Sequence, residues 1–99
     1  MPQVLLFLLM VIASPVSAAG DSEAGRLLAE RSCGGCHTVG EARGTDTAPP
    51  FRSIARDPAK SDSYLYAWLT DPHPPMPNLS LTRREIADVM AYLASLRAP

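Results

Sequence analysis

The sequence predicts a small all-α domain. Three stretches show the helical spacing of apolar residues, over about residues 22–32, 62–71 and 83–96. No stretch shows the alternation of apolar and polar residues between turn signals that indicates a β-strand. Apolar material for a core is scarce, and a domain this small usually needs a disulfide, a metal or a cofactor in addition.

Each of the three expected helices begins with a capping signal. Asp21-Ser22 can cap the first helix and Ser61 the second, and these residue types accept hydrogen bonds from the first turn. Thr82 and Glu85 have the spacing of a capping box at the start of the third helix. The second helix must end before Pro72, because the residue preceding a proline disfavours the helical conformation.

The buried face of each helix follows from the spacing of its apolar residues. The face expected in the first helix holds Ala24, Leu27, Leu28 and Arg31. In the second it holds Leu65, Trp68 and Leu69. In the third it holds Ile86, Val89, Met90, Leu93 and Leu96. A short turn of helix over residues 53–56 is also expected.

The N-terminal segment has the layout of a secretory signal peptide. Residues 4–13 are an unbroken apolar run, Pro15 follows, and small residues end the segment at Ala18. We expect residues 1–18 to be cleaved and residues 19–99 to form one exported domain, in the periplasm or at the outer face of the cytoplasmic membrane. An uncleaved anchor is the alternative, although the run is short and broken for a membrane span.

The charge of the chain is nearly balanced. Nine Lys and Arg residues face ten Asp and Glu residues, which gives a formal net charge of −1. This balance argues against nucleic acid as a partner, because nucleic-acid binders show a basic patch. It also leaves no polybasic signal for a membrane surface.

Both cysteines of the chain, Cys33 and Cys36, lie beside His37 in a C-x-x-C-H pattern. This pattern is typical of covalent haem c attachment, with each thiol forming a thioether to one vinyl group. The adjacent histidine then serves as the proximal ligand of the iron. Three alternatives use the same residue types: a thioredoxin-type dithiol, which lacks its βαβ context, a zinc site including His73, and a structural disulfide.

A second protein ligand would close the other face of the haem and suit it to electron transfer. Met76 is the preferred distal ligand, because it lies in a stiff loop with four prolines in residues 71–77. Met90 falls on the apolar face of the last helix and is interpreted as core. His73 remains an alternative ligand; otherwise it is a loop histidine that hydrogen-bonds nearby.

Together these residues resemble the class I cytochromes c over nearly all of residues 21–97. The resemblance implies a small cytochrome c fold, with three main helices and loops wrapped around one covalently attached haem. It places Gly25 of the first helix against Tyr92 of the last. It further implies that the carbonyl of Pro49 orients His37 and that Phe51 and Trp68 lie in the haem surroundings.

The function implied by the resemblance is that of a monohaem electron carrier, not an enzyme. Its iron would cycle between Fe(III) and Fe(II) with His37 and Met76 as axial ligands, between redox protein partners that the sequence does not identify. Alternatives are a dedicated haem subunit of a larger oxidoreductase, or a haem sensor or peroxidase with an open distal site. The sequence shows no second catalytic constellation. Arg52 and Arg56 are either haem propionate partners or solvated surface residues.

Overall fold

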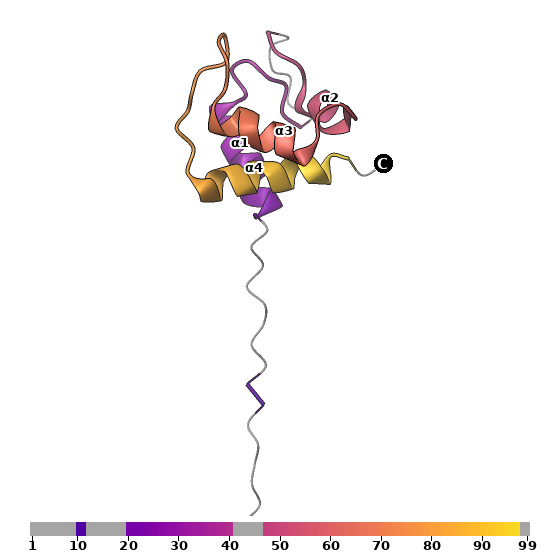
Figure 1. Ribbon diagram of the computed structural model, residues 1–99, viewed down its shortest axis with the longest axis vertical. Helices are drawn as coiled ribbons and strands as arrows, with labels where there is room; N and C mark the ends of the chain where they lie inside the picture. The colour runs from indigo at the N-terminus through magenta and orange to yellow at the C-terminus, as the bar shows by residue number, and fades with distance from the viewer. Residues whose placement is uncertain (1–9, 12–19, 41–46, 98–99) are drawn as a thin grey trace, which may run out of the picture.

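The structure is a computed structural model that describes residues 10–11, 20–40 and 47–97. Four helices are present, and no strand occurs within these ranges: α1 (Ser22–Ser32), α2 (Phe51–Arg56), α3 (Asp62–Thr70) and α4 (Arg83–Ser95) (Figure 1). The predicted all-α class is confirmed. The expected signal segment lies almost wholly outside the described residues, and no described helix is long and apolar enough to cross a membrane.

The three predicted capping signals begin the three longer helices. The carboxylate of Asp21 accepts from two N–H groups in the first turn of α1, and the hydroxyl of Ser61 accepts from the N–H of Tyr64 at 3.1 Å. Thr82 and Glu85 form the complete capping box of α4, with each side chain accepting from the other residue's main chain. The local sequence therefore sets where these helices start.

Helices α1 and α4 cross in close contact (Figure 1). Gly25 of α1 lies at this contact. A Cβ built on Gly25 would overlap the main-chain carbonyl of Asp88 and approach the Cβ of Tyr92 at 3.0 Å. Only glycine lets the two backbones approach this closely. This contact fixes α1 against α4 and so positions the turn that follows α1.

The buried face of α1 differs from the one expected from apolar spacing. Its buried residues are Gly25, Leu28 and Ala29, whereas Leu27 is 51% exposed and Arg31 is also exposed. The close crossing explains the difference, because it places the small residues at the interface and turns the larger Leu27 away. Ala29 is completely buried there.

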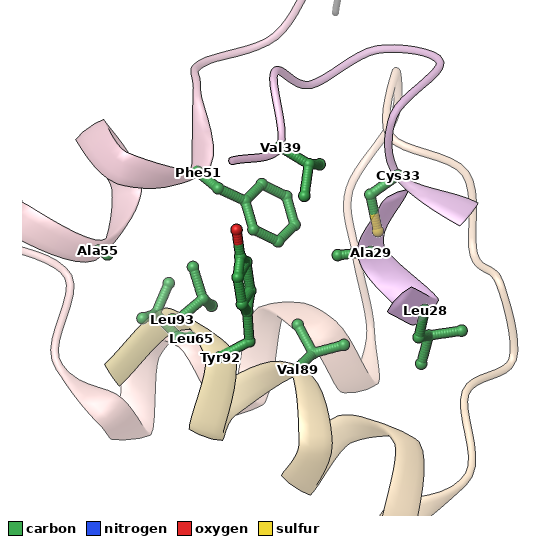
Figure 2. Packing of buried hydrophobic residues seen from close by; sticks show 10 residues of the cluster. All are labelled: Leu28, Ala29, Cys33, Val39, Phe51, Ala55, Leu65, Val89, Tyr92 and Leu93. Carbon is green, nitrogen blue, oxygen red and sulfur yellow. The ribbon is translucent and has the colours of Figure 1, made fainter. Parts of the chain in front are cut away.

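The core gathers buried side chains from all four helices around α4. Tyr92 extends from α4 towards Phe51, and their ring centroids are 6.1 Å apart (Figure 2). Phe51 is the first residue of α2, so this helix begins two residues before the expected turn. The reason is tertiary: Pro50 precedes α2 as N-cap, and the N–H of Phe51 donates to the carbonyl of Thr38 at 3.0 Å.

Candidate cofactor site

A pocket of about 430 Å³ lies where the turn after α1 meets α3 and the loop that follows α3. This volume is within the range of roughly 300–1,000 Å³ typical of cofactor sites. Its lining is mostly apolar. The predicted residues that line it are Cys33, Cys36, His37, Pro49, Trp68, His73 and Met76.

The two cysteines lie in a turn that continues from the end of α1. Cys33 is the C-cap of α1, and its carbonyl accepts from the N–H groups of Cys36 at 3.2 Å and His37 at 3.0 Å. A Cβ on Gly34 would lie 2.6 Å from the carbonyl oxygen of Glu30, so this position needs glycine. The turn thereby brings both thiols and the imidazole to one pocket.

The two thiols lie in different environments. Cys33 is buried, Cys36 is exposed, and neither forms a disulfide. Burial raises the pKa of the Cys33 thiol, because the thiolate would lose its solvation. The structure therefore does not support a disulfide between them.

His37 is oriented by one short hydrogen bond. Its Nδ1 lies 2.6 Å from the carbonyl oxygen of Pro49, and Phe51 meets the imidazole edge-on with centroids 5.4 Å apart. A carbonyl oxygen only accepts, so Nδ1 must be the donor, and in the neutral imidazole this leaves the lone pair on Nε2. That nitrogen is the one able to coordinate a metal, and the second-shell carbonyl sets the ring's direction.

Met76 reaches the pocket from the loop between α3 and α4. Its main-chain N–H donates to the carbonyl of His73 at 3.0 Å, which closes a turn around Pro74 and Pro75. The indole Nε1–H of Trp68 donates to the sulfur of Met76 at 3.1 Å. The half-buried thioether is thus held by both its main chain and its side chain.

A row of aromatic rings follows the same side of the pocket. Tyr64 stacks on Trp68 with ring centroids 6.1 Å apart and planes 19° apart. The ring of His73 lies 4.8 Å from that of Trp68 at an angle of 43°. His73 therefore lines the pocket as a partner of Trp68.

Other residues singled out from the sequence lie outside the pocket lining. Phe51 is buried behind His37, and Met90 is half-buried against the core from α4. Arg56 donates through Nε to the carbonyl of Leu96 at 3.0 Å, and neither Arg56 nor Arg52 lines the pocket.

Several residues of the pocket lining were not predicted from the sequence, Lys60 and Tyr64 among them. The signal was present for Tyr64, because it lies four residues before Trp68 and so shares its helix face. Lys60 forms an ion pair of 2.7 Å with Asp57, which raises the pKa of Lys60 and lowers that of Asp57.

A second, more open hollow of about 480 Å³ lies between the end of α2, the start of α3 and Arg97. Asp62 pairs with Arg97 at 2.8 Å there, and Lys60 pairs with Asp57. Its main charged groups thus bind each other. The zinc alternative is also unsupported, because nowhere in the described ranges do three His, Cys, Asp or Glu side chains gather as a metal site.

Comparison with known proteins agrees with the geometry of the pocket. The family model described as Cytochrome c matches residues 22–97. The chain belongs to the cytochrome c family. It is also 41% identical over 96 residues to "Cytochrome c-552" of Bradyrhizobium diazoefficiens, across 95% of this chain and 92% of that protein. No solved structure matches the chain significantly.

Membership of this family means that the chain carries a covalently bound haem c with its iron and acts as a haem electron carrier. The donor set of the pocket fits that group. It holds two thiols that form no disulfide, an imidazole oriented through its Nδ1, and a thioether, all along a mostly apolar cavity.

Proposed function

We propose that this cytochrome c is an exported monohaem electron carrier with histidine–methionine ligation. Cys33 and Cys36 hold the haem by thioethers, His37 is the proximal ligand and Met76 is the distal ligand. The observation that carries the proposal is the Nδ1 hydrogen bond of His37 to Pro49, in a pocket that Met76 also lines. When bound, haem c supplies one redox centre that exchanges a single electron as its iron changes between ferric and ferrous states.

The chain's own residues lower the reorganisation energy of that exchange. The carbonyl of Pro49 holds the His37 ring in one direction, and the loop prolines around Met76 limit the conformations of the thioether. Phe51 packs against the edge of the imidazole and restricts its rotation. Ligands that stay in place, with apolar neighbours that exclude water, need little rearrangement when the charge of the iron changes.

Partner proteins dock, on this proposal, over exposed residues of the pocket lining. Cys36, Pro74 and Pro75 are exposed and uncharged side chains that line the pocket. Electron transfer needs close approach of the donor or acceptor to the haem, and these residues offer a surface without charge. The partners are an exported redox donor and acceptor.

Export follows from residues 1–18, which we propose to be removed as a signal peptide. Gly20 already packs against α4, where an added Cβ would overlap the carbonyl of Ala87. Cleavage after Ala18 would leave this contact intact. Intact-mass measurement of the exported protein tests the position, and a mass that retains residues 1–18 would show an uncleaved anchor.

Spectra of the exported protein test the ligation. The oxidised protein should show the weak red absorption band of a haem iron ligated by a methionine sulfur, and the reduced protein should not bind CO rapidly. Replacing Met76→Leu should abolish the band and permit fast CO binding, whereas the core variant Met90→Leu should do neither. A wild-type protein without the band that binds CO fast would favour a sensor or peroxidase.

A further variant distinguishes Met76 from His73 as the distal ligand. His73→Ala removes the competing imidazole and should leave the red band in place. A wild-type protein without the band that binds CO slowly, together with fast CO binding in His73→Ala but not in Met76→Leu, would assign the distal position to His73. Co-purification of the native protein with a catalytic subunit would identify it as a dedicated subunit of an oxidoreductase.

A further inference from the structure

Lys60 is the one lysine, arginine, aspartate or glutamate among the described residues that line the haem pocket. Haem c brings two propionate carboxylates with it, and a carboxylate that enters a mostly apolar site needs a cation or hydrogen-bond donors. Arg52 and Arg56, the alternative propionate partners from the sequence, do not line the pocket. Lys60 is therefore the cation that the pocket lining itself provides.

The ammonium group of Lys60 is held by a turn that leads into α3. Its Nζ donates to the Oδ2 of Asp57 at 2.7 Å, and its main-chain N–H donates to the carbonyl of Asp57 at 3.0 Å. The carboxylate of Asp57 also accepts from the N–H of Ala59 at 2.9 Å. These bonds fix both ends of the lysine side chain, so the ammonium loses little further freedom when it binds a ligand.

The same ammonium can bond a second carboxylate without giving up Asp57. An ammonium has three N–H donors, and the bond to Asp57 takes one of them. The Nζ lies 6.0 Å from the ring centroid of Tyr64, which stacks on Trp68 in the pocket lining. The hydrogen bond to Asp57 also raises the pKa of Lys60, so the group stays charged at neutral pH.

A positive charge at this place acts on the redox equilibrium of the haem. Reduction makes the haem one unit more negative, so a cation nearby stabilises the ferrous state more than the ferric state. The carboxylate of Asp57 acts in the opposite direction, but it lies outside the lining of the haem pocket. The ammonium is the nearer charge, and its effect should therefore dominate.

We propose that Lys60 binds a propionate of haem c, that Asp57 positions its ammonium group, and that Lys60 thereby raises the reduction potential. The inference goes beyond the proposed function, because it identifies how this chain binds the charged edge of the haem. It does not depend on whether Met76 or His73 is the distal ligand.

Four variants of the haem-containing protein test the inference. Lys60→Gln removes the charge and keeps a long polar side chain, whereas Lys60→Arg keeps the charge. Asp57→Asn removes the counter-ion alone. Arg52→Gln is the matched control, because it removes one positive charge from an exposed residue of α2 outside the pocket lining.

The first measurement is the midpoint potential at one fixed pH. In Lys60→Gln the equilibrium constant for reduction should fall roughly three- to tenfold, because one charge near the haem is lost. Lys60→Arg and Arg52→Gln should both stay close to the wild type, and Asp57→Asn should not lower the potential. An unchanged potential in Lys60→Gln, or an equal fall in Arg52→Gln, would overturn the proposal.

The second measurement is the propionate bending mode in the resonance Raman spectrum, which responds to hydrogen bonds at the carboxylate. The mode should shift in Lys60→Gln, return towards the wild-type position in Lys60→Arg, and stay in place in Arg52→Gln. A mode that does not move in Lys60→Gln would show that Lys60 serves Asp57 alone, and the proposal would be wrong.

The third measurement uses the fact that the chain has one lysine. Labelling the lysine with nitrogen-15 gives a single Nζ signal in NMR, so the signal needs no assignment. It should differ between the ferric and the ferrous protein, because unpaired electrons of the ferric iron shift nearby nuclei. The same position in both oxidation states would place the ammonium away from the haem and contradict the proposal.

The outcomes separate this inference from the proposed function. The red absorption band reports the distal ligand, whereas the Raman mode reports the propionate. A wild-type protein without the band, in which Lys60→Gln still shifts the Raman mode, would overturn ligation by Met76 and support the role of Lys60. A wild-type protein with the band and no Raman shift in Lys60→Gln would overturn the role of Lys60 alone.

Discussion

The main-chain N–H of Asp21 donates to the carboxylate of Asp88 over 2.8 Å, across 67 residues of sequence. Asp21 is also the N-cap of α1, and Asp88 is a buried residue of α4 that is 8% exposed. The pair therefore joins the start of α1 to α4, next to the close contact at Gly25. This junction fixes the direction in which α1 carries Cys33 to the pocket.

Replacing Asp88→Ala should destabilise the haem-containing protein by about 2 kcal/mol, because it removes a hydrogen bond to a charged group. Asp88→Asn keeps an acceptor oxygen and should therefore lose less stability than Asp88→Ala. Arg84→Ala is the control, since Arg84 is 77% exposed and pairs with Asp88 only at 3.3 Å. Urea unfolding followed by circular dichroism measures all three. Equal losses in Asp88→Ala and Arg84→Ala would assign the effect to the ion pair.

Gly25→Ala should destabilise the protein by about 1–3 kcal/mol, because one added methyl group overpacks the crossing of α1 and α4. The added Cβ would overlap the carbonyl of Asp88, which is main chain and can move only with the helix. Ser22→Ala, in the exposed first turn of α1, is the control. The free energy of unfolding in urea is the measurement. An unchanged or raised value for Gly25→Ala would contradict the contact.

The limits of α1 and α4 could be predicted because they depend on local groups. Asp21 and Thr82 bond to main-chain groups within three residues, so the signal is complete in a short window. The packing partners of these two helices could not be predicted from the sequence. The sequence alone would place Asp88 among the solvent-exposed charges of an amphipathic helix. It is buried only because α1 packs against α4 at this point. The exposure of Leu27 likewise depends on how closely α1 approaches α4.

The same distinction between local and tertiary signals applies to the residues of the candidate site. Cys33, Cys36 and His37 form a contiguous motif whose chemistry fixes their spacing, so the sequence alone indicates them. The contact of Trp68 with the sulfur of Met76 depends on how the proline loop folds back on α3, which local spacing does not determine. The pocket position of Lys60 was missed for the same reason, because it depends on the loop that leads from α2 into α3.

The free energy of unfolding should fall above about pH 10, because the buried phenol of Tyr92 then ionises. Burial raises the pKa of its phenol above the ordinary value of 10, although an N–H from Gly40 partly opposes this. The folded protein therefore holds the proton more tightly than the unfolded chain does. The contribution is fully present below pH 10 and is lost as the pH rises towards the folded pKa.

The variant Tyr92→Phe should remove this alkaline loss. Near neutral pH it should be less stable by roughly 1 kcal/mol, because the hydrogen bond from Gly40 is gone. The gap between wild type and Tyr92→Phe should narrow above pH 10, at no more than about 1.4 kcal/mol per pH unit. The exposed Tyr66→Phe is the control, and urea unfolding at several pH values is the measurement. A gap of constant size across that range would show that Tyr92 does not titrate in this way.

Electron exchange should depend only weakly on salt. The formal net charge is −1, and the exposed pocket residues Cys36, Pro74 and Pro75 carry no charge. Raising the ionic strength from about 0.01 M to about 1 M shortens the screening length from roughly 30 Å to 3 Å, which weakens any steering between charged surfaces. We expect the rates with a cationic and an anionic small redox reagent to change less than about threefold over this range.

A charge added beside the pocket tests whether this measurement can detect steering. Leu79 lines the pocket and is 39% exposed, so Leu79→Lys should place a positive charge near the haem without filling the cavity. The rate with the anionic reagent should then rise at low salt and fall as salt is added, and the rate with the cationic reagent should do the reverse. A steep salt dependence already present in the wild type would mean that charges elsewhere on the surface direct partners to the haem, and that the uncharged surface around Cys36 is not where they dock.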